Sequence, residues 1–133
     1  MTQPQSQSPP EPPGDSVRGF LPEHEGRQLY EWAHQAAPIG PLLEIGSYCG
    51  KSTIWLGQAA KAHGTVVFAL DHHRGSEEHQ PGESHHDEAL TNTAGQFDSF
   101  GEFRRNIAAA GLEDTVIPIV ASSESVGPYW QGG

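Results

Sequence analysis

Apolar residues recur along the chain with two alternating spacings, one typical of helices and one typical of buried strands. The first helical stretch covers residues 22–37, where Leu29, Trp32, Ala33 and Ala36 follow one another at steps of three and four. This spacing predicts an amphipathic helix whose apolar stripe, including Trp32, faces the core.

The rest of the pattern alternates short apolar runs with helically spaced segments. We expect strands over residues 41–45, 65–70 and 115–120 and helices over 50–63 and 100–110. Phe100 and Phe103 are expected in the core. Pro118 favours an edge position or a bulge for the last strand, because proline donates no ladder hydrogen bond. Strands that alternate with helices predict parallel βαβ units, so the predicted fold class is α/β.

Two segments lack either spacing. Residues 1–16 hold five prolines and no large apolar side chain, which predicts a disordered tail that precedes a single domain over residues 17–133. Residues 72–98 are polar and rich in histidine, and we expect a long loop there.

Composition narrows the class of partner. A formal net charge of −10, with only 7 lysines and arginines, argues against nucleic acid as a partner because phosphate contacts need clustered cations. The chain begins with no signal peptide, and no stretch approaches the roughly 18 consecutive apolar residues of a membrane span. We therefore expect a soluble, cytoplasmic protein with no membrane partner.

The stretch EIGSYCGKST at residues 44–53 joins the first strand to its helix and ends like a nucleotide-binding P-loop. A P-loop has four residues between its first glycine and the Gly-Lys pair, whereas Gly46 and Gly50 enclose only three. A dinucleotide fingerprint also needs a longer step from its first glycine to its last. Both phosphate-binding hypotheses fail on this spacing, which makes a nucleotide hydrolase the weakest candidate.

Glu44 followed by Gly46 and Gly50 instead resembles motif I of the class I S-adenosylmethionine-dependent methyltransferases, with Tyr48 in place of the usual middle glycine. The resemblance implies a Rossmann-like parallel sheet and S-adenosylmethionine as cofactor. Glu44 suits a cationic ligand, since the sulfonium and the α-amino group are both positive. The loop residues that the resemblance assigns to the cofactor are Gly46, Ser47, Tyr48, Gly50 and Ser52.

Asp71 at the end of the second strand supports the same assignment. A carboxylate there can accept hydrogen bonds from both ribose hydroxyls of an adenosine. The family places residues near the adenine at the end of the third strand, which here reads Ser122-Ser123. With His72 beside Asp71 and the histidine-rich loop that follows, the chain resembles actinobacterial small-molecule O-methyltransferases over about residues 20–130.

Catalytic residues are harder to predict. His72 or His73 is the candidate general base. A metal site built from Asp71, His72, His73 and further loop residues is a less favoured alternative because their spacing is irregular. Those further residues are His79, His85, His86 and Asp87. We expect Lys51 to face solvent near the ligand, and Ser52 and Thr53 to cap the helix.

The resemblance ends after the third strand, whereas the family's sheet continues with a fourth strand that carries an acidic motif. We therefore expect the amino-terminal part of a methyltransferase that acts on a small-molecule acceptor. The alternative is a non-catalytic half-domain that persists by pairing with itself or a partner, because the open edge of the first strand invites pairing.

Overall fold

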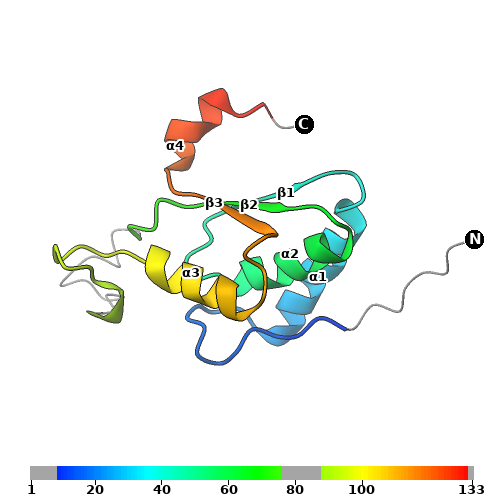
Figure 1. The fold of residues 1–133 in the computed structure, drawn as a ribbon, viewed down its shortest axis with the longest axis horizontal. Coiled ribbons are helices and arrows are strands. Elements are labelled where there is room, and N and C mark those ends of the chain that lie inside the picture. Colours follow the sequence, from blue (N-terminus) through cyan, green and yellow to red (C-terminus); the bar gives the residue numbers. More distant parts are fainter. Residues whose placement is uncertain (1–8, 76–87, 132–133) are drawn as a thin grey trace, which may run out of the picture.

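A computed structural model describes residues 9–75 and 88–131 and shows three strands with their connecting helices (Figure 1). The six predicted elements are all present, in the predicted order. They are α1 (Glu23–Ala36), β1 (Leu42–Ile45), α2 (Lys51–Ala62), β2 (Val67–Leu70), α3 (Phe100–Ala109) and β3 (Val116–Ile119). Three short helices complete the described elements: η2 (Glu88–Leu90) precedes α3, and α4 (Ser123–Val126) and η3 (Gly127–Tyr129) follow β3.

The sheet is parallel and has the order β1-β2-β3. Val67 of β2 pairs with Leu42 on one side and with Val116 on the other. β3 therefore lies at an edge, as Pro118 predicted. Because all three strands run the same way, their carboxyl ends meet at one edge of the sheet, and the loops that leave this edge are neighbours.

The two faces of the sheet differ. α1, α2 and α3 lie on one face, and α4 lies on the other side (Figure 1). The covered face packs Ile54 of α2 and Phe103 of α3 against Val67 and Val116. Apolar side chains of the other face stay 41–63% exposed: Leu43, Ile45, Ile117 and Val120.

Two residues of the predicted apolar stripe, Trp32 and Ala36, are exposed. Trp32 is 60% exposed, and the buried positions of α1 are instead Gly26, Tyr30 and Ala33. The stripe is rotated because Gly26 lies directly against the Trp55 indole of α2, where a Cβ atom would come within 2.1 Å of Nε1. The close contact between Gly26 and Trp55 therefore sets which side of α1 is buried, and Trp32 is left exposed.

Both irregular segments are described in part. Glu11, within the predicted tail, exchanges two hydrogen bonds with Gln58 of α2 through its backbone N–H and carbonyl (2.7 and 2.8 Å). Of the predicted loop, residues 72–75 and 88–98 are described, and Leu90 and Phe97 there pack against Cys49. The disordered tail stays a prediction, since residues 1–8 lie outside the described part. No helix in the described ranges is long and apolar enough to cross a membrane.

Candidate functional site

The loops that follow the three strands meet at the carboxyl edge of the sheet, and Asp71 joins them. The Tyr48 backbone N–H donates to Asp71 Oδ2 at 2.8 Å, across the gap between the first two loops. The Ala121 N–H after β3 donates to the Asp71 carbonyl at 3.3 Å. The predicted motif and the predicted ribose-binding carboxylate are therefore in direct contact.

The motif loop, residues 46–50, uses an unusual backbone. Gly46, Tyr48 and Gly50 have φ angles of 87°, 47° and 93°, a region that favours glycine. Tyr48 thus adopts a backbone conformation that favours glycine, and its ring stacks on Phe97 with centroids 6.4 Å apart. A Cβ atom at Gly46 would meet no described atom within 4 Å, so this part of the loop faces open space.

Glu44 lies beneath this loop rather than at the surface. Its carboxylate accepts hydrogen bonds from Ser52 Oγ at 2.5 Å and from Thr53 Oγ1. The expected capping role of Ser52 and Thr53 is therefore wrong, because both hydroxyls turn back to the acid at the end of β1 and α2 has no side-chain cap. Burial raises the pKa of Glu44, although the two hydroxyl donors lower it in part and Asp71 adds a smaller increase.

A pocket of about 260 Å³ opens on the motif loop. Residues 46–48 and 51–52 line one side, and residues 18–21 line the other. Ser47 is only 2% exposed, and its hydroxyl has no hydrogen-bond partner among the described residues. An unpaired buried hydroxyl costs free energy, so its position in a pocket wall is typical of a group that a ligand completes.

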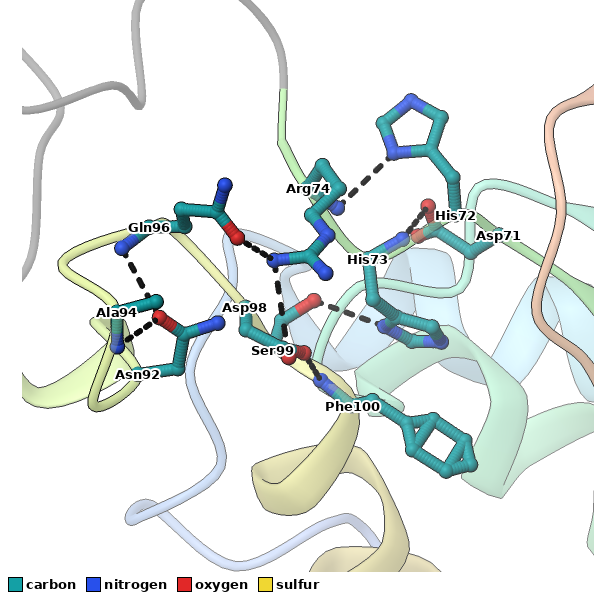
Figure 2. A network of polar contacts seen from close by, with 10 residues as sticks. All are labelled: Asp71, His72, His73, Arg74, Asn92, Ala94, Gln96, Asp98, Ser99 and Phe100. Atoms are coloured by element: carbon teal, nitrogen blue, oxygen red, sulfur yellow. Dashed lines mark hydrogen bonds and ion pairs between the residues drawn. The ribbon is translucent and has the colours of Figure 1, made fainter.

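The two histidines after Asp71 point to opposite sides (Figure 2). His72 is exposed, and its Nδ1 accepts from the Arg74 N–H at 2.9 Å. His73 is 1% exposed and has a φ of 62°, its N–H donates to Asp71 Oδ1 at 2.9 Å, and its Nδ1 lies 2.8 Å from Ser99 Oγ. Both histidines were predicted as candidate bases at the site, but of the two only the His72 side chain is exposed to solvent.

His73 is enclosed by α3. The rings of Phe100 and Phe103 lie 5.3 and 5.2 Å from the imidazole, between centroids, and Nε2 has no partner among the described residues. Burial lowers the pKa of His73, and the neighbouring Asp71 and Asp98 offset part of that decrease. Burial therefore disfavours the protonated form of this imidazole.

The third loop supplies Ser122 and Ser123. The Ser122 hydroxyl accepts from the Ser125 N–H at 3.1 Å and so begins α4, whereas Ser123 is exposed. Both lie after β3 at the same edge as Asp71. Their proposed place near an adenine stays a prediction.

The described residues contain no group of three or more His, Cys, Asp or Glu side chains that could hold a metal ion. His79, His85, His86 and Asp87 lie outside the described residues.

Comparison with known proteins identifies the family. Residues 43–133 match the methyltransferase domain family, and the chain belongs to it. The chain is also similar to a solved structure described as cofactor-bound Rv0187 from MTB, with a TM-score of 0.58 and 24% sequence identity. That match covers 87% of this chain but only 42% of the other, so the likeness concerns the fold, and this chain spans less than half of its neighbour.

Sequence reasoning missed residues 18–21, which form the far wall of the pocket. They precede α1 and lie about 25 residues or more before the motif loop, and no spacing rule links the two segments.

Proposed function

We propose that this chain is the cofactor-binding part of an S-adenosylmethionine-dependent methyltransferase that acts on a small-molecule acceptor. One observation carries the proposal beyond family membership: the contact of 2.8 Å between the Tyr48 N–H and Asp71 Oδ2. It brings a loop with open space above Gly46 next to a carboxylate that suits a ribose.

The residues at this edge fit the proposed cofactor. Each Asp71 oxygen accepts one backbone N–H, from Tyr48 or His73, which leaves lone pairs for two ribose hydroxyls. Burial raises the pKa of Glu44 and so disfavours its charged form, and a cationic ligand above the loop would offset that increase. Ser47 lines the pocket, and its hydroxyl has no partner among the described residues. Ser122 and Ser123 would border the adenine.

The cofactor supplies an electrophilic methyl group on a cationic sulfur. The chain's own contribution is to hold that group in position, since an in-line displacement depends mainly on the alignment of its reactants. If the acceptor is a hydroxyl, a base must take its proton. His72 is a better candidate for that base than His73, because His72 is exposed and the His73 imidazole is enclosed.

A second candidate is a non-catalytic half-domain that pairs with another copy or a partner. The exposed apolar face around Leu43, Ile45 and Ile117 favours it, since such surfaces usually mark contacts. Light scattering after size exclusion separates the candidates: a dimer with no affinity for the cofactor supports the second.

Calorimetric titration with S-adenosylhomocysteine and, separately, with Mg²⁺-ATP tests the proposed function. Saturable binding of the first ligand at micromolar concentrations, without binding of ATP, is the expected result. Binding of ATP alone would contradict the proposal and revive the P-loop hypothesis.

A further inference from the structure

Two histidines meet at the amino edge of the sheet, opposite the edge that holds Asp71. His34 lies in the last turn of α1, which precedes β1, and His63 is the C-cap residue of α2, which precedes β2. Nε2 of His63 lies 2.9 Å from Nδ1 of His34. The described residues give neither imidazole another polar partner, so the two rings form a pair of their own.

The two imidazole rings are inclined to the line that joins their nitrogens. A straight hydrogen bond of this length would hold the ring centroids about 5.2 Å apart. They lie 4.4 Å apart instead, with the ring planes at 52°. A metal ion with bonds of about 2.0–2.1 Å to two nitrogens at right angles would place the nitrogens about 2.9 Å and the centroids about 4.5 Å apart. Both observed distances fit that arrangement.

The surroundings of the pair hold the rings in place and favour a cation. The buried Tyr30 ring stacks on His34, with centroids 5.6 Å apart and planes at 15°. Both histidines lie at the carboxyl ends of helices, where the helix dipole favours positive charge. Lys61, the cation nearest in sequence to His63, donates instead to the Gly111 carbonyl at 3.1 Å. Both histidines are half-buried, so an ion from solvent can reach them.

We propose that His34 and His63 form a binding site for a divalent transition metal of the nickel and copper type. Imidazole nitrogen is a preferred ligand of these metals, and ligands at right angles suit them better than they suit tetrahedral Zn²⁺. Water completes the coordination, because the described residues add no third His, Cys, Asp or Glu side chain to the pair. The bound ion replaces the contact between the rings and ties the end of α1 to the end of α2. This site is independent of the proposed function.

Thermal unfolding of the full chain with and without Ni²⁺ tests the site. About 1 mM Ni²⁺, tenfold above a dissociation constant of about 0.1 mM, should raise Tm by about 4 °C, because the two histidines meet only in the folded chain. Histidines that bind Ni²⁺ equally in the folded and the unfolded chain give no such rise. His34→Gln and His63→Gln should therefore each remove most of it.

His24→Gln is the matched control, since His24 is an exposed histidine at the other end of α1, and it should keep the full rise. A second measurement needs no variant: octahedral Ni²⁺ is paramagnetic, so it should broaden the wild-type amide signals of residues 33–37 and 60–65 in ¹H–¹⁵N spectra. No rise in the wild type, a rise that both variants keep, or broadening that spares these two segments would overturn the proposal. The experiments contain no cofactor, so the proposed function stands or falls separately.

Discussion

The loops after β1 and β2 are built alike. Each places a non-glycine residue in the left-handed region, Tyr48 with φ 47° and His73 with φ 62°. Each buries a polar atom that has no partner among the described residues, Ser47 Oγ in one and His73 Nε2 in the other. Asp71 anchors both, because its two oxygens accept the N–H groups of Tyr48 and His73.

The loops differ in what packs against them. The motif loop opens on a pocket, and Ser47, whose buried hydroxyl is unpaired among the described residues, is one of the residues that line it. The Asp71–Gly75 loop is closed by α3, and the His73 imidazole lies beside Phe100 (Figure 2). The Phe103 ring packs against it as well. The same left-handed backbone conformation therefore lines a pocket in one loop and packs against α3 in the other. The difference lies in what surrounds each loop.

The largest expected effect comes from Asp71→Ala, which removes the anchor of both loops. Two hydrogen bonds to a charged acceptor disappear, so the free energy of unfolding should fall by about 2–4 kcal/mol, and affinity for S-adenosylhomocysteine should fall below detection. Denaturant titration and calorimetry measure the two quantities. Asp98→Ala is the control, because Asp98 likewise accepts a backbone N–H, that of Phe100 at 3.0 Å, but lies on the closed side; it should keep ligand affinity.

Ser99→Ala should affect only the closed loop. Without the Ser99 hydroxyl, Nδ1 of the buried His73 also loses its partner, which should cost about 1–3 kcal/mol in the free energy of unfolding. Affinity for S-adenosylhomocysteine should stay within about twofold, since a loss of that size amounts to less than about 0.5 kcal/mol. A weakened affinity with unchanged stability would show that the two loops are not separable as described.

A smaller effect is expected on the pH dependence of the free energy of unfolding. Because the pKa of His73 is lower in the folded state than its ordinary value of 6.5, the unfolded chain binds the proton more readily. The resulting stability is present above pH 6.5 and is lost as pH falls through the lowered pKa. His73→Asn, a residue that tolerates positive φ, should flatten this decline in denaturant titrations, and an equally steep decline in the variant would contradict it.

The smallest change in stability is expected for Ser47→Ala, the open-loop counterpart of Ser99→Ala. Removing an unpaired buried hydroxyl should leave the free energy of unfolding unchanged or slightly higher. Affinity for S-adenosylhomocysteine should fall about three- to tenfold, the loss of about one hydrogen bond. Loss of stability with unchanged affinity would place Ser47 in the packing rather than in the pocket.

Much of this architecture could be predicted from the sequence, because periodic apolar spacing reports which elements are buried. The three strands, their parallel pairing and the edge position of β3 followed from local pattern. So did the meeting of the motif loop with Asp71, since parallel strands end at a common edge. Tyr48 stands where the family's motif has its middle glycine, and its φ of 47° lies in the region that favours glycine.

What escaped prediction depends on contacts between distant segments. The exposed Trp32 reflects the fit of Gly26 against Trp55, which no helical spacing encodes. The hydrogen bond from Lys51 to the Gly19 carbonyl joins two segments 32 residues apart, and no sequence pattern predicts that they meet. The burial of His73, beside an exposed His72, depends on the position of α3.

The central claim is that one edge of the sheet, at the motif loop and Asp71, binds the cofactor. The most direct measurement is a ¹H–¹⁵N NMR titration of the chain with S-adenosylhomocysteine. The account predicts saturable amide shifts concentrated at residues 46–52 and 71–73, with further shifts at residues 18–21, which line the same pocket. Shifts confined to the far end of the helices, around Ala62 and Gly111, or no saturable shifts at all, would contradict it.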